Sequence, residues 1–325
     1  MKAILCKAYG LPSSLVLENI ESPKPKEKEV LVSLRACGVN FPDTLIIQGL
    51  YQFKPPLPFT PGSDIAGIVK EVGLEVKHLK VGDEVFGFVP YGGFAEEVIV
   101  PSNACFPKLP NMDFPTAASF LLAYGTSYHA LKDRALLKEG ETLLVLGASG
   151  GVGLAAVELG KLMGAKVIAA ASSDDKLALC KEYGAVETIN YATEDLKNRI
   201  KELTDGKGVD VVYDPVGGHY SEVALRSMAW EGRFLVVGFA AGDIPKIPLN
   251  LALLKGCSIV GVFWGSFAMK TPKKNMVNTM ELMQWYGEGK LKPHIHGIYP
   301  LAETSKALEE MMNRQVKGKV VIGMT

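Results

Sequence analysis

Hydrophobic and polar positions follow two different patterns along this chain of 325 residues. Over 142–263, short apolar runs alternate with segments of helical periodicity, and glycine or polar residues separate them. The predicted strands are Thr142–Leu146, Lys166–Ala171, Val186–Asn190, Val209–Asp214, Arg233–Val237 and Ser258–Phe263. Because strands that alternate with helices form parallel βαβ units, this part of the chain predicts an α/β fold, a doubly wound Rossmann sheet.

The N-terminal part consists instead of short strand-like runs punctuated by proline and glycine turns. The predicted strands are Lys2–Cys6, Leu15–Ile20, Glu29–Val39, Asp64–Val72, Glu84–Phe88 and Ala95–Val100. This spacing is typical of an irregular β-barrel. Helices are expected at Pro115–Ala130 and Met276–Gly287, and strands at Ile298–Pro300 and Lys319–Ile322 are expected to return to the barrel.

These two patterns predict two domains. We expect a barrel domain over 1–123 and 265–325, and a nucleotide-binding domain over 124–264 inserted into it. At this length, the chain can build a hydrophobic core in each domain. A cleft between two such domains is a common place for a cofactor and a substrate.

A glycine-rich loop, GASGGVG, connects the strand Thr142–Leu146 to a helical segment. Glycine lets the backbone approach a pyrophosphate closely, and the N–H groups at the start of the next helix point at the anion. Gly150, Gly151 and Val152 are therefore candidate phosphate contacts. The spacing is G-x-x-G-G-x-G, not the stricter G-x-G-x-x-G, so a glycine turn without a ligand is the alternative.

The end of the second predicted strand of this domain indicates which dinucleotide is bound. NAD-binding domains place a carboxylate there for the ribose hydroxyls, but here the strand ends in Ala171, Ser172 and Ser173. Ser172 can donate to a 2′-phosphate and Lys176 can reach it as a point charge, which favours NADPH. The alternative makes Ser172 a helix N-cap and Lys176 a solvated lysine, and both roles can coexist.

Charge and cysteine content exclude several classes of protein. The 35 basic and 35 acidic side chains cancel, which argues against nucleic acid as a partner. No apolar run approaches the roughly 20 residues of a membrane-spanning helix, so we expect a soluble, cytoplasmic protein without a membrane partner. The five cysteines are widely spaced and contain no C-x-x-C pair, which argues against disulfides and structural zinc.

Six motifs then occur in a fixed order. They are RACGVNFPDTLIIQGLY (Arg35–Tyr51), PFTPGSDIAGIVKEVG (Pro58–Gly73), VGDEVFGF (Val81–Phe88), YGTSYHAL (Tyr124–Leu131), the glycine-rich loop and DPVGG (Asp214–Gly218). The chain resembles the medium-chain dehydrogenase/reductase superfamily, and within it the zinc-free, quinone oxidoreductase-like branch, nearly from end to end. The resemblance implies a GroES-like barrel domain, NADPH as cofactor, and a homodimer paired through the edge strand near Ser258–Phe263.

Two positions depart from the zinc alcohol dehydrogenases of this superfamily. Those enzymes carry a cysteine after a C-G-V-like triplet and a histidine in a G-H-E motif, whereas this chain has Asn40 and Ser63. Neither replaces a thiolate or an imidazole as a zinc ligand. Without a Lewis acid, the expected reaction is hydride transfer from NADPH to an already activated small-molecule acceptor, a quinone or another conjugated carbonyl.

Two other functions remain open. The first is reduction of conjugated enones or of enoyl thioesters such as acryloyl-CoA, for which a basic rim would suit the CoA group. The candidate residues for this basic rim are Lys54, Lys270, Lys273 and Lys274, which are equally well explained as surface lysines. The second is an NADPH-binding protein with negligible turnover.

The resemblance also assigns roles to single residues. It implies that Asn40 faces the nicotinamide ribose or the substrate, and that Tyr51 is a proton donor or stabilises an oxyanion. It places Thr126 near the nicotinamide, and Tyr191 and Arg314 near the adenosine phosphate. Asp43 is interpreted as a cap for the segment after Asn40.

Phe239 and Phe263 follow the fifth and sixth strands of the nucleotide domain and are candidates for the pocket lining. Ordinary packing accounts for several of these residues equally well. Tyr51 can be an aromatic plug, Thr126 a helix-packing hydroxyl, and the two phenylalanines core residues. Arg314 can be a solvated residue at a helix end.

Overall fold

The computed structural model of this protein describes residues 1–324. The chain forms two compact units. The first contains Met1–Leu122 and the C-terminal segment from Pro293, and the second is the continuous stretch Ala123–Lys292. Each unit has its own sheet and its own apolar core, so the second unit is inserted into the sequence of the first.

The first unit is built mainly from antiparallel strands. Its strands are β1 (Lys2–Leu5), β2 (Val16–Asn19), β3 (Glu29–Val39), β4 (Asp64–Val72), β5 (Glu84–Phe88), β6 (Glu97–Pro101), β7 (Cys105–Pro107), β14 (Ile295–Pro300) and β15 (Lys319–Gly323). Its helices are α1 (Phe41–Ile46), α2 (Phe114–Ala117) and α11 (Thr304–Met312), with short 3-10 turns η1 (Pro12–Ser14), η2 (Ser102–Ala104) and η4 (Leu301–Glu303).

β3 is the central strand of this unit. The main sheet has the order β14-β15-β3-β4-β5-β7, β6 also pairs with β3, and β1 and β2 form a separate pair. Inward-facing Val30, Val32 and Leu34 of β3 are buried in the core, and β15 closes the sheet beside the C-terminal half of the same strand. The sheet that was expected from short strands and turns is confirmed, including the return of the C-terminal strands.

The second unit has a parallel sheet of six strands. These are β8 (Thr142–Leu146), β9 (Lys166–Ala171), β10 (Glu187–Asn190), β11 (Val209–Asp214), β12 (Met228–Val236) and β13 (Ser258–Gly261). The order is β10-β9-β8-β11-β12-β13, and every pair is parallel. The chain runs outward from β8 first to one side and then to the other, so the predicted doubly wound Rossmann topology is confirmed.

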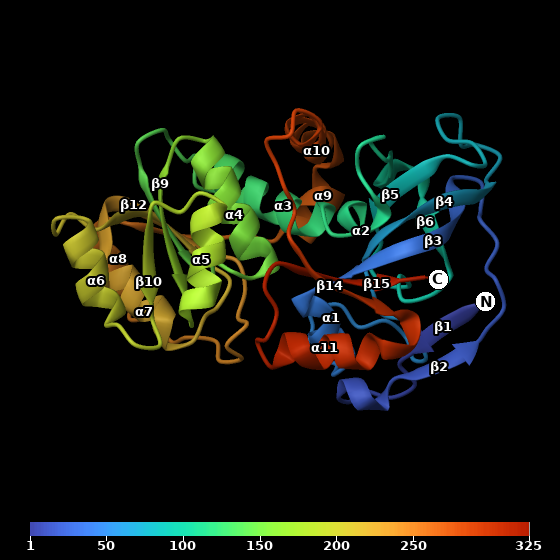
Figure 1. Ribbon diagram of the computed structural model, residues 1–325, viewed down its shortest axis with the longest axis horizontal. Coiled ribbons are helices and arrows are strands. Elements are labelled where there is room, and N and C mark those ends of the chain that lie inside the picture. Colours follow the sequence, from blue (N-terminus) through green and yellow to red (C-terminus); the bar gives the residue numbers. More distant parts are fainter. Residues whose placement is uncertain (325) are drawn as a thin grey trace. The chain divides into compact units, whose positions relative to one another are not determined.

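Helices cover both faces of this sheet, as the yellow-green and orange ribbons of Figure 1 show. They are α4 (Gly151–Leu162) and α5 (Asp174–Glu182) on one face, and α6 (Leu196–Leu203), α7 (His219–Arg226) and α8 (Asn250–Lys255) on the other. The unit also contains α3 (Leu121–Tyr128), the π-helix η3 (His129–Arg134), α9 (Trp264–Lys270) and α10 (Pro272–Gly287). α6, α7 and α8 share one apolar cluster with the strands, whereas Gly160 of α4 packs on Leu143 and Val167 of the opposite face.

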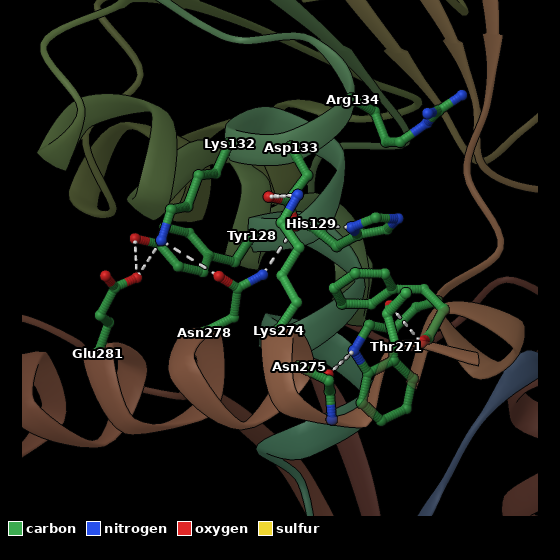
Figure 2. Close-up of polar contacts among 12 residues, drawn as sticks. Tyr128, His129, Lys132, Asp133, Arg134, Thr271, Lys274, Asn275, Asn278 and Glu281 are labelled. Carbon is green, nitrogen blue, oxygen red and sulfur yellow. Dashed lines mark hydrogen bonds and ion pairs between the residues drawn. The ribbon is translucent and has the colours of Figure 1, made fainter. Parts of the chain in front are cut away.

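Residues 265–292 lie in the second unit, which differs from the domain boundary expected from the sequence. A cluster of polar contacts fastens α10 to the end of α3 and to η3 (Figure 2). Asn278 Nδ2 donates to Asp133 Oδ2 at 2.8 Å, and Tyr128 Oη donates to Glu281 at 2.9 Å. Burying these groups together makes α10 part of the nucleotide unit.

The helix predicted where the chain passes from the first unit to the second is interrupted. The segment Pro115–Ala130 is divided between α2 and α3, and the chain then continues as the π-helix. The helix from His219 ends at Arg226, because Met228 already pairs with Val209 in the sheet. Within residues 1–324, no helix has both the length and the apolar character needed to cross a membrane.

Candidate active site

The glycine-rich loop forms a cradle between β8 and α4. Gly147 has a positive φ of 57°, Gly150 is the N-cap, and α4 begins at Gly151. A Cβ on Gly153 would lie 2.3 Å from the carbonyl oxygen of Gly147, so only glycine allows this helix to start so close to the strand. Gly150 has no side chain to cap the first turn, so the N–H groups of Gly151 and Val152 suit an anion such as a pyrophosphate.

Three predicted ribose-phosphate residues lie together at the carboxyl ends of β9 and β10. Lys176 Nζ donates to Ser172 Oγ at 3.3 Å, and the backbone N–H of Tyr191 donates to Ala171, the last residue of β9, at 3.1 Å. The N-cap of α5 is Ser173, so the alternative that made Ser172 the cap is wrong by one residue.

The remaining candidates of the second unit lie at the same end of its sheet. Thr126 is buried in α3, and its neighbour Ser127 donates to the carbonyl of Val152 at 2.7 Å, which ties α3 to the cradle. Phe239, half-buried, follows β12 and packs against Gly217. Phe263 follows β13 and is 51 % exposed.

The candidates of the first unit are centred on Asn40, directly after β3. In the antiparallel ladder, Val320 of β15 pairs with Val39, which places Lys319 opposite Asn40. Asp64 begins β4 and pairs with Gly38. The sheet register therefore brings together three side chains that lie far apart in the sequence, and all three are buried.

Lys319 makes the central contacts of this group. Its Nζ donates to Asn40 Oδ1 and, at 3.1 Å, to the carbonyl of Val39, and it lies 3.7 Å from Asp64 Oδ2. Asn40 Nδ2 donates to the carbonyl of Gly38 at 3.3 Å. Neither oxygen of Asp64 has a hydrogen-bond partner within residues 1–324. We call Asn40, Asp64 and Lys319 the Lys319 cluster.

Burial dominates the electrostatics of this region. It raises the pKa of Asp64 to about 6, a rise that the Lys319 ammonium limits, and it lowers the pKa of Lys319. Burial likewise raises the pKa of Asp43 to about 7, against the hydrogen bond from the Asn40 backbone N–H. That bond, 2.7 Å to Asp43 Oδ2, gives Asp43 a structural role, but Asp43 lies within α1 and completes a capping box whose N-cap is Asn40. The pKa of the Cys37 thiol is raised for the same reason.

These residues do not fit a catalytic zinc ion. Zinc in enzymes is held by three protein ligands drawn from Cys, His and carboxylates. Here the amide of Asn40 and the hydroxyl of Ser63 stand where the zinc alcohol dehydrogenases carry cysteine and histidine. The ammonium of Lys319 contacts the amide of Asn40. Across the described 1–324, no group of three or more His, Cys, Asp or Glu side chains is placed to hold a metal.

Tyr51 and Arg314 also belong to the first unit. Tyr51 is half-buried against the apolar core, and burial raises its pKa, with a further contribution from the Asp43 carboxylate. Arg314 follows α11, is exposed and has a positive φ of 58°. The candidate site residues are thus divided, with Asn40, Tyr51 and Arg314 in the first unit and the others in the second.

Sequence reasoning did not find Lys319. A lysine at the start of an apolar strand resembles the charged residues that commonly flank strands in solvent. The only signal in the sequence is that the strand after it, VVIG, is wholly apolar and close to the C-terminus. The side chain of Lys319 is nevertheless only 6 % exposed.

Comparison with known proteins places the chain in a family. Residues 26–111 match the alcohol dehydrogenase GroES-like domain, and residues 151–284 match the family described as zinc-binding dehydrogenase. The quinone oxidoreductase-like protein 2 homolog of Nematostella vectensis is 40 % identical over 99 % of this chain and 88 % of its own length.

Solved structures agree over the whole chain. Quinone oxidoreductase of Escherichia coli, crystallised with NADPH, has a TM-score of 0.94 and 30 % identity, and the match covers 100 % of both chains. The CurK enoyl reductase has a TM-score of 0.91 and 28 % identity, covering 100 % of this chain and 99 % of that one. The GroES-like and Rossmann folds expected from the sequence are therefore confirmed, and the chain belongs to the quinone oxidoreductase family of the medium-chain dehydrogenases/reductases.

Proposed function

We propose that this protein is an NADPH-dependent oxidoreductase that reduces a quinone or another conjugated carbonyl without zinc. The observation that carries the proposal is the ammonium group of Lys319 bonded to Asn40, where the zinc enzymes of the superfamily have a ligand. A dication would meet this buried positive charge at close range. The acceptor must therefore be reactive enough to need no metal.

The NADPH preference is supported by Ser172, Lys176 and Tyr191. The hydroxyl and ammonium at the end of β9 suit a dianionic phosphate, and a carboxylate that would repel it is missing from the strand tip. Of the two carboxylates that begin α5, Asp174 accepts a hydrogen bond from Asn190 Nδ2 at 2.8 Å, and Asp175 accepts one from Ser173 Oγ. Arg314 is proposed as a second contact for the same phosphate.

When bound, NADPH supplies the hydride. The chain's own residues supply hydrogen bonds and a proton to the reduced acceptor. Asn40 Nδ2 is proposed to donate to the nicotinamide ribose or to the acceptor oxygen. Tyr51 is proposed to protonate the anion that forms, because a tyrosine hydroxyl carries its proton at neutral pH and can donate it. The cradle of Gly150, Gly151 and Val152 is proposed to bind the pyrophosphate, with Thr126, Phe239 and Phe263 beside the nicotinamide and acceptor.

Reduction of an enoyl thioester is the second candidate. It is favoured by Tyr51 and by the similarity to an enoyl reductase structure. Of the lysines considered for a CoA rim, Lys274 is less suited, because it forms an ion pair with Asp133 at 2.8 Å. The quinone proposal therefore ranks first.

A homodimer is also proposed. β13 is the edge strand of the parallel sheet, and apolar side chains on and near it are exposed. These are Trp230, Leu249, Leu253, Leu254 and Ile259. Size-exclusion chromatography with light scattering tests the proposal, since a particle of 35.0 kDa would contradict it.

The free thiols of all five cysteines support a cytoplasmic location, which cell fractionation tests.

The function is tested by NADPH oxidation with chelator-treated protein. The acceptors are 9,10-phenanthrenequinone, 1,4-benzoquinone and crotonoyl-CoA, with NADH in parallel. Fast turnover of the quinones with NADPH is expected. Faster turnover of the thioester would favour the enoyl reductase, tight NADPH binding without turnover would favour a binding protein, and a requirement for added zinc would contradict the proposal.

A further inference from the structure

Lys319 and Asp64 form a buried ion pair, and its contribution to stability does not account for it. Lys319 and Asp64 are both buried, and an ion pair in such surroundings is often no more stable than apolar residues of the same size. Buried Asp43 and Cys37 also favour the charged form of Lys319, and the apolar neighbours Val39, Ile65 and Val320 are fully buried. Stability therefore does not explain why a lysine stands at this position of β15.

The contacts of Lys319 determine how the Asn40 side chain is oriented. An ammonium group can only donate, so the atom of Asn40 that faces Lys319 must be Oδ1. The two hydrogens of Nδ2 must then point the other way, and one of them bonds the carbonyl of Gly38 at 3.3 Å. The orientation of the amide is fixed by the charge beside it, and the amide group of Asn40 also helps to lower the pKa of Asp64.

Asp64 fixes the lysine in turn. Its Oδ2 lies 3.7 Å from Nζ, at an ion-pair distance, and it favours the charged form of Lys319. The carbonyl of Val39 holds the same Nζ at 3.1 Å. Three elements, β3, β4 and β15, thus converge on one amide.

We propose that Lys319 is a positioning residue, which together with Asp64 holds Asn40 with its Nδ2 presented as a hydrogen-bond donor to the nicotinamide ribose or to the acceptor. This inference rests on the proposed role of Asn40. Without the ammonium, the amide can turn over and present Oδ1, which cannot donate.

A double-mutant cycle of Asn40→Ala and Lys319→Met tests the inference. Lys319→Met is expected to lower kcat for 9,10-phenanthrenequinone reduction by about 10- to 100-fold, with a much smaller change in KM for NADPH. If Lys319 acts through Asn40, the double variant should turn over about as slowly as Asn40→Ala alone. Effects that multiply would overturn the inference, because they would show that Lys319 acts independently.

The same cycle is measured by urea unfolding without cofactor or acceptor. The unfolding midpoint of the double variant should fall by less than the sum of the two single shifts, because both substitutions remove the same contact. Additive shifts would contradict the contact itself.

Two further variants separate positioning from folding. Lys319→Met combined with Asp64→Asn removes both charges, so this protein should unfold at a midpoint near that of the wild type while kcat stays low. Recovery of kcat would overturn the inference, because it would mean that Lys319 only balances Asp64. Lys319→Arg keeps the charge and a donor, and should recover part of the lost kcat.

Lys108 provides the matched control. Its side chain is also 6 % exposed, it donates to the carbonyl of Met112 at 2.7 Å, and it pairs with Glu84 at 2.9 Å. Lys108→Met should lower the unfolding midpoint but leave kcat unchanged, and an equal loss of kcat would show that any buried lysine has this effect.

The outcomes for Asn40 and Lys319 distinguish the two proposals. If Asn40→Ala has no effect on kcat, the proposed role of Asn40 fails and the inference fails with it. If Asn40→Ala lowers kcat but Lys319→Met does not, only the positioning role fails.

Discussion

Each unit of the molecule buries an aspartate beside a lysine, but the two pairs differ in how many partners the carboxylate has. In the second unit, Asp133 accepts from His129 Nδ1, Asn278 Nδ2 and Lys274 Nζ, each at 2.8 Å (Figure 2). In the first unit, neither carboxylate oxygen of Asp64 makes a hydrogen bond within residues 1–324, and the ammonium of Lys319 lies 3.7 Å from Oδ2.

The pKa values follow this difference. Burial alone raises the pKa of Asp133, but hydrogen bonds from Lys274, His129 and Asn278 outweigh it and hold the pKa below its usual value. Burial raises the pKa of Asp64 to about 6, because the Lys319 ammonium, the Leu122 backbone and the Asn40 side chain together offset only part of it. A carboxylate that receives several short hydrogen bonds stabilises the fold, whereas Asp64 leaves the ammonium of Lys319 free to bond Asn40.

The largest effect is expected from removing the well-paired carboxylate. Asp133→Ala leaves His129, Lys274 and Asn278 without their acceptor and should lower the free energy of unfolding by about 3–5 kcal/mol. Turnover per folded molecule should not change. Urea unfolding and NADPH oxidation check this, and a loss of kcat without a loss of stability would erase the difference between the two regions.

The next largest loss of stability is expected where the backbone is closely packed near the Lys319 cluster. A Cβ on Gly38 would lie 2.0 Å from the carbonyl oxygen of Ala118, so Gly38→Ala should destabilise the first unit by about 2–3 kcal/mol. Gly261 in β13 is the control, since no atom lies within 4 Å of its Cβ position. Thermal unfolding should show Gly261→Ala close to the wild type, and equal shifts for both variants would refute the packing argument.

The two aspartates should give opposite pH dependences. The pKa of Asp64 is raised in the folded state, so its contribution to stability is lost as the pH rises from about 4 to about 6. The pKa of Asp133 is lowered, so its contribution is lost as the pH falls below about 4. Within its pH range, each group changes the free energy of unfolding by up to about 1.4 kcal/mol per pH unit.

Urea midpoints of the wild type, Asp64→Asn and Asp133→Asn across this pH range measure the two slopes. The stability of Asp64→Asn relative to the wild type should increase with pH, and that of Asp133→Asn should decrease. Slopes of the same sign would break the comparison.

The smallest effect concerns a lysine that contacts a hydroxyl. Lys176 donates to Ser172, and Lys176→Met should raise the Kd for NADPH about fivefold, equivalent to about 1 kcal/mol, without changing the Kd for NADH. Lys274→Met, which removes a lysine from the Asp133 ion pair, should change neither. Nicotinamide fluorescence titration measures both constants, and an equal loss for NADH would assign Lys176 to another part of the nucleotide.

The fold was largely predictable because its signals are local. Alternation of apolar runs and helical segments defines β8 to β13, and the positions of Gly147 and Gly153 define the turn into α4. The π-helix after α3 was not predictable, because it depends on contacts of His129 and Asp133 with α9 and α10, more than 130 residues away. α1 was also missed, since it has only 6 residues.

The site was predictable only in part. Ser172 and Lys176 are four residues apart on one turn, so their contact can be inferred from the sequence alone. Asn40 was identified through the motif that contains it, but its partner Lys319 depends on the register between β3 and β15. Register across such a distance is set by the folded sheet and leaves no local pattern.

The position of β15 in the chain has a consequence for protein synthesis. Lys319 and the Val39 carbonyl it binds are separated by 280 residues, so β3 leaves the ribosome long before its neighbour exists. At about 5–20 residues per second, the delay is roughly a quarter of a minute to one minute. During that time the inserted Rossmann unit can fold, while the edge of β3 stays open to other strands or to chaperones. The amide of Asn40 acquires its orientation only after Lys319 has been synthesised.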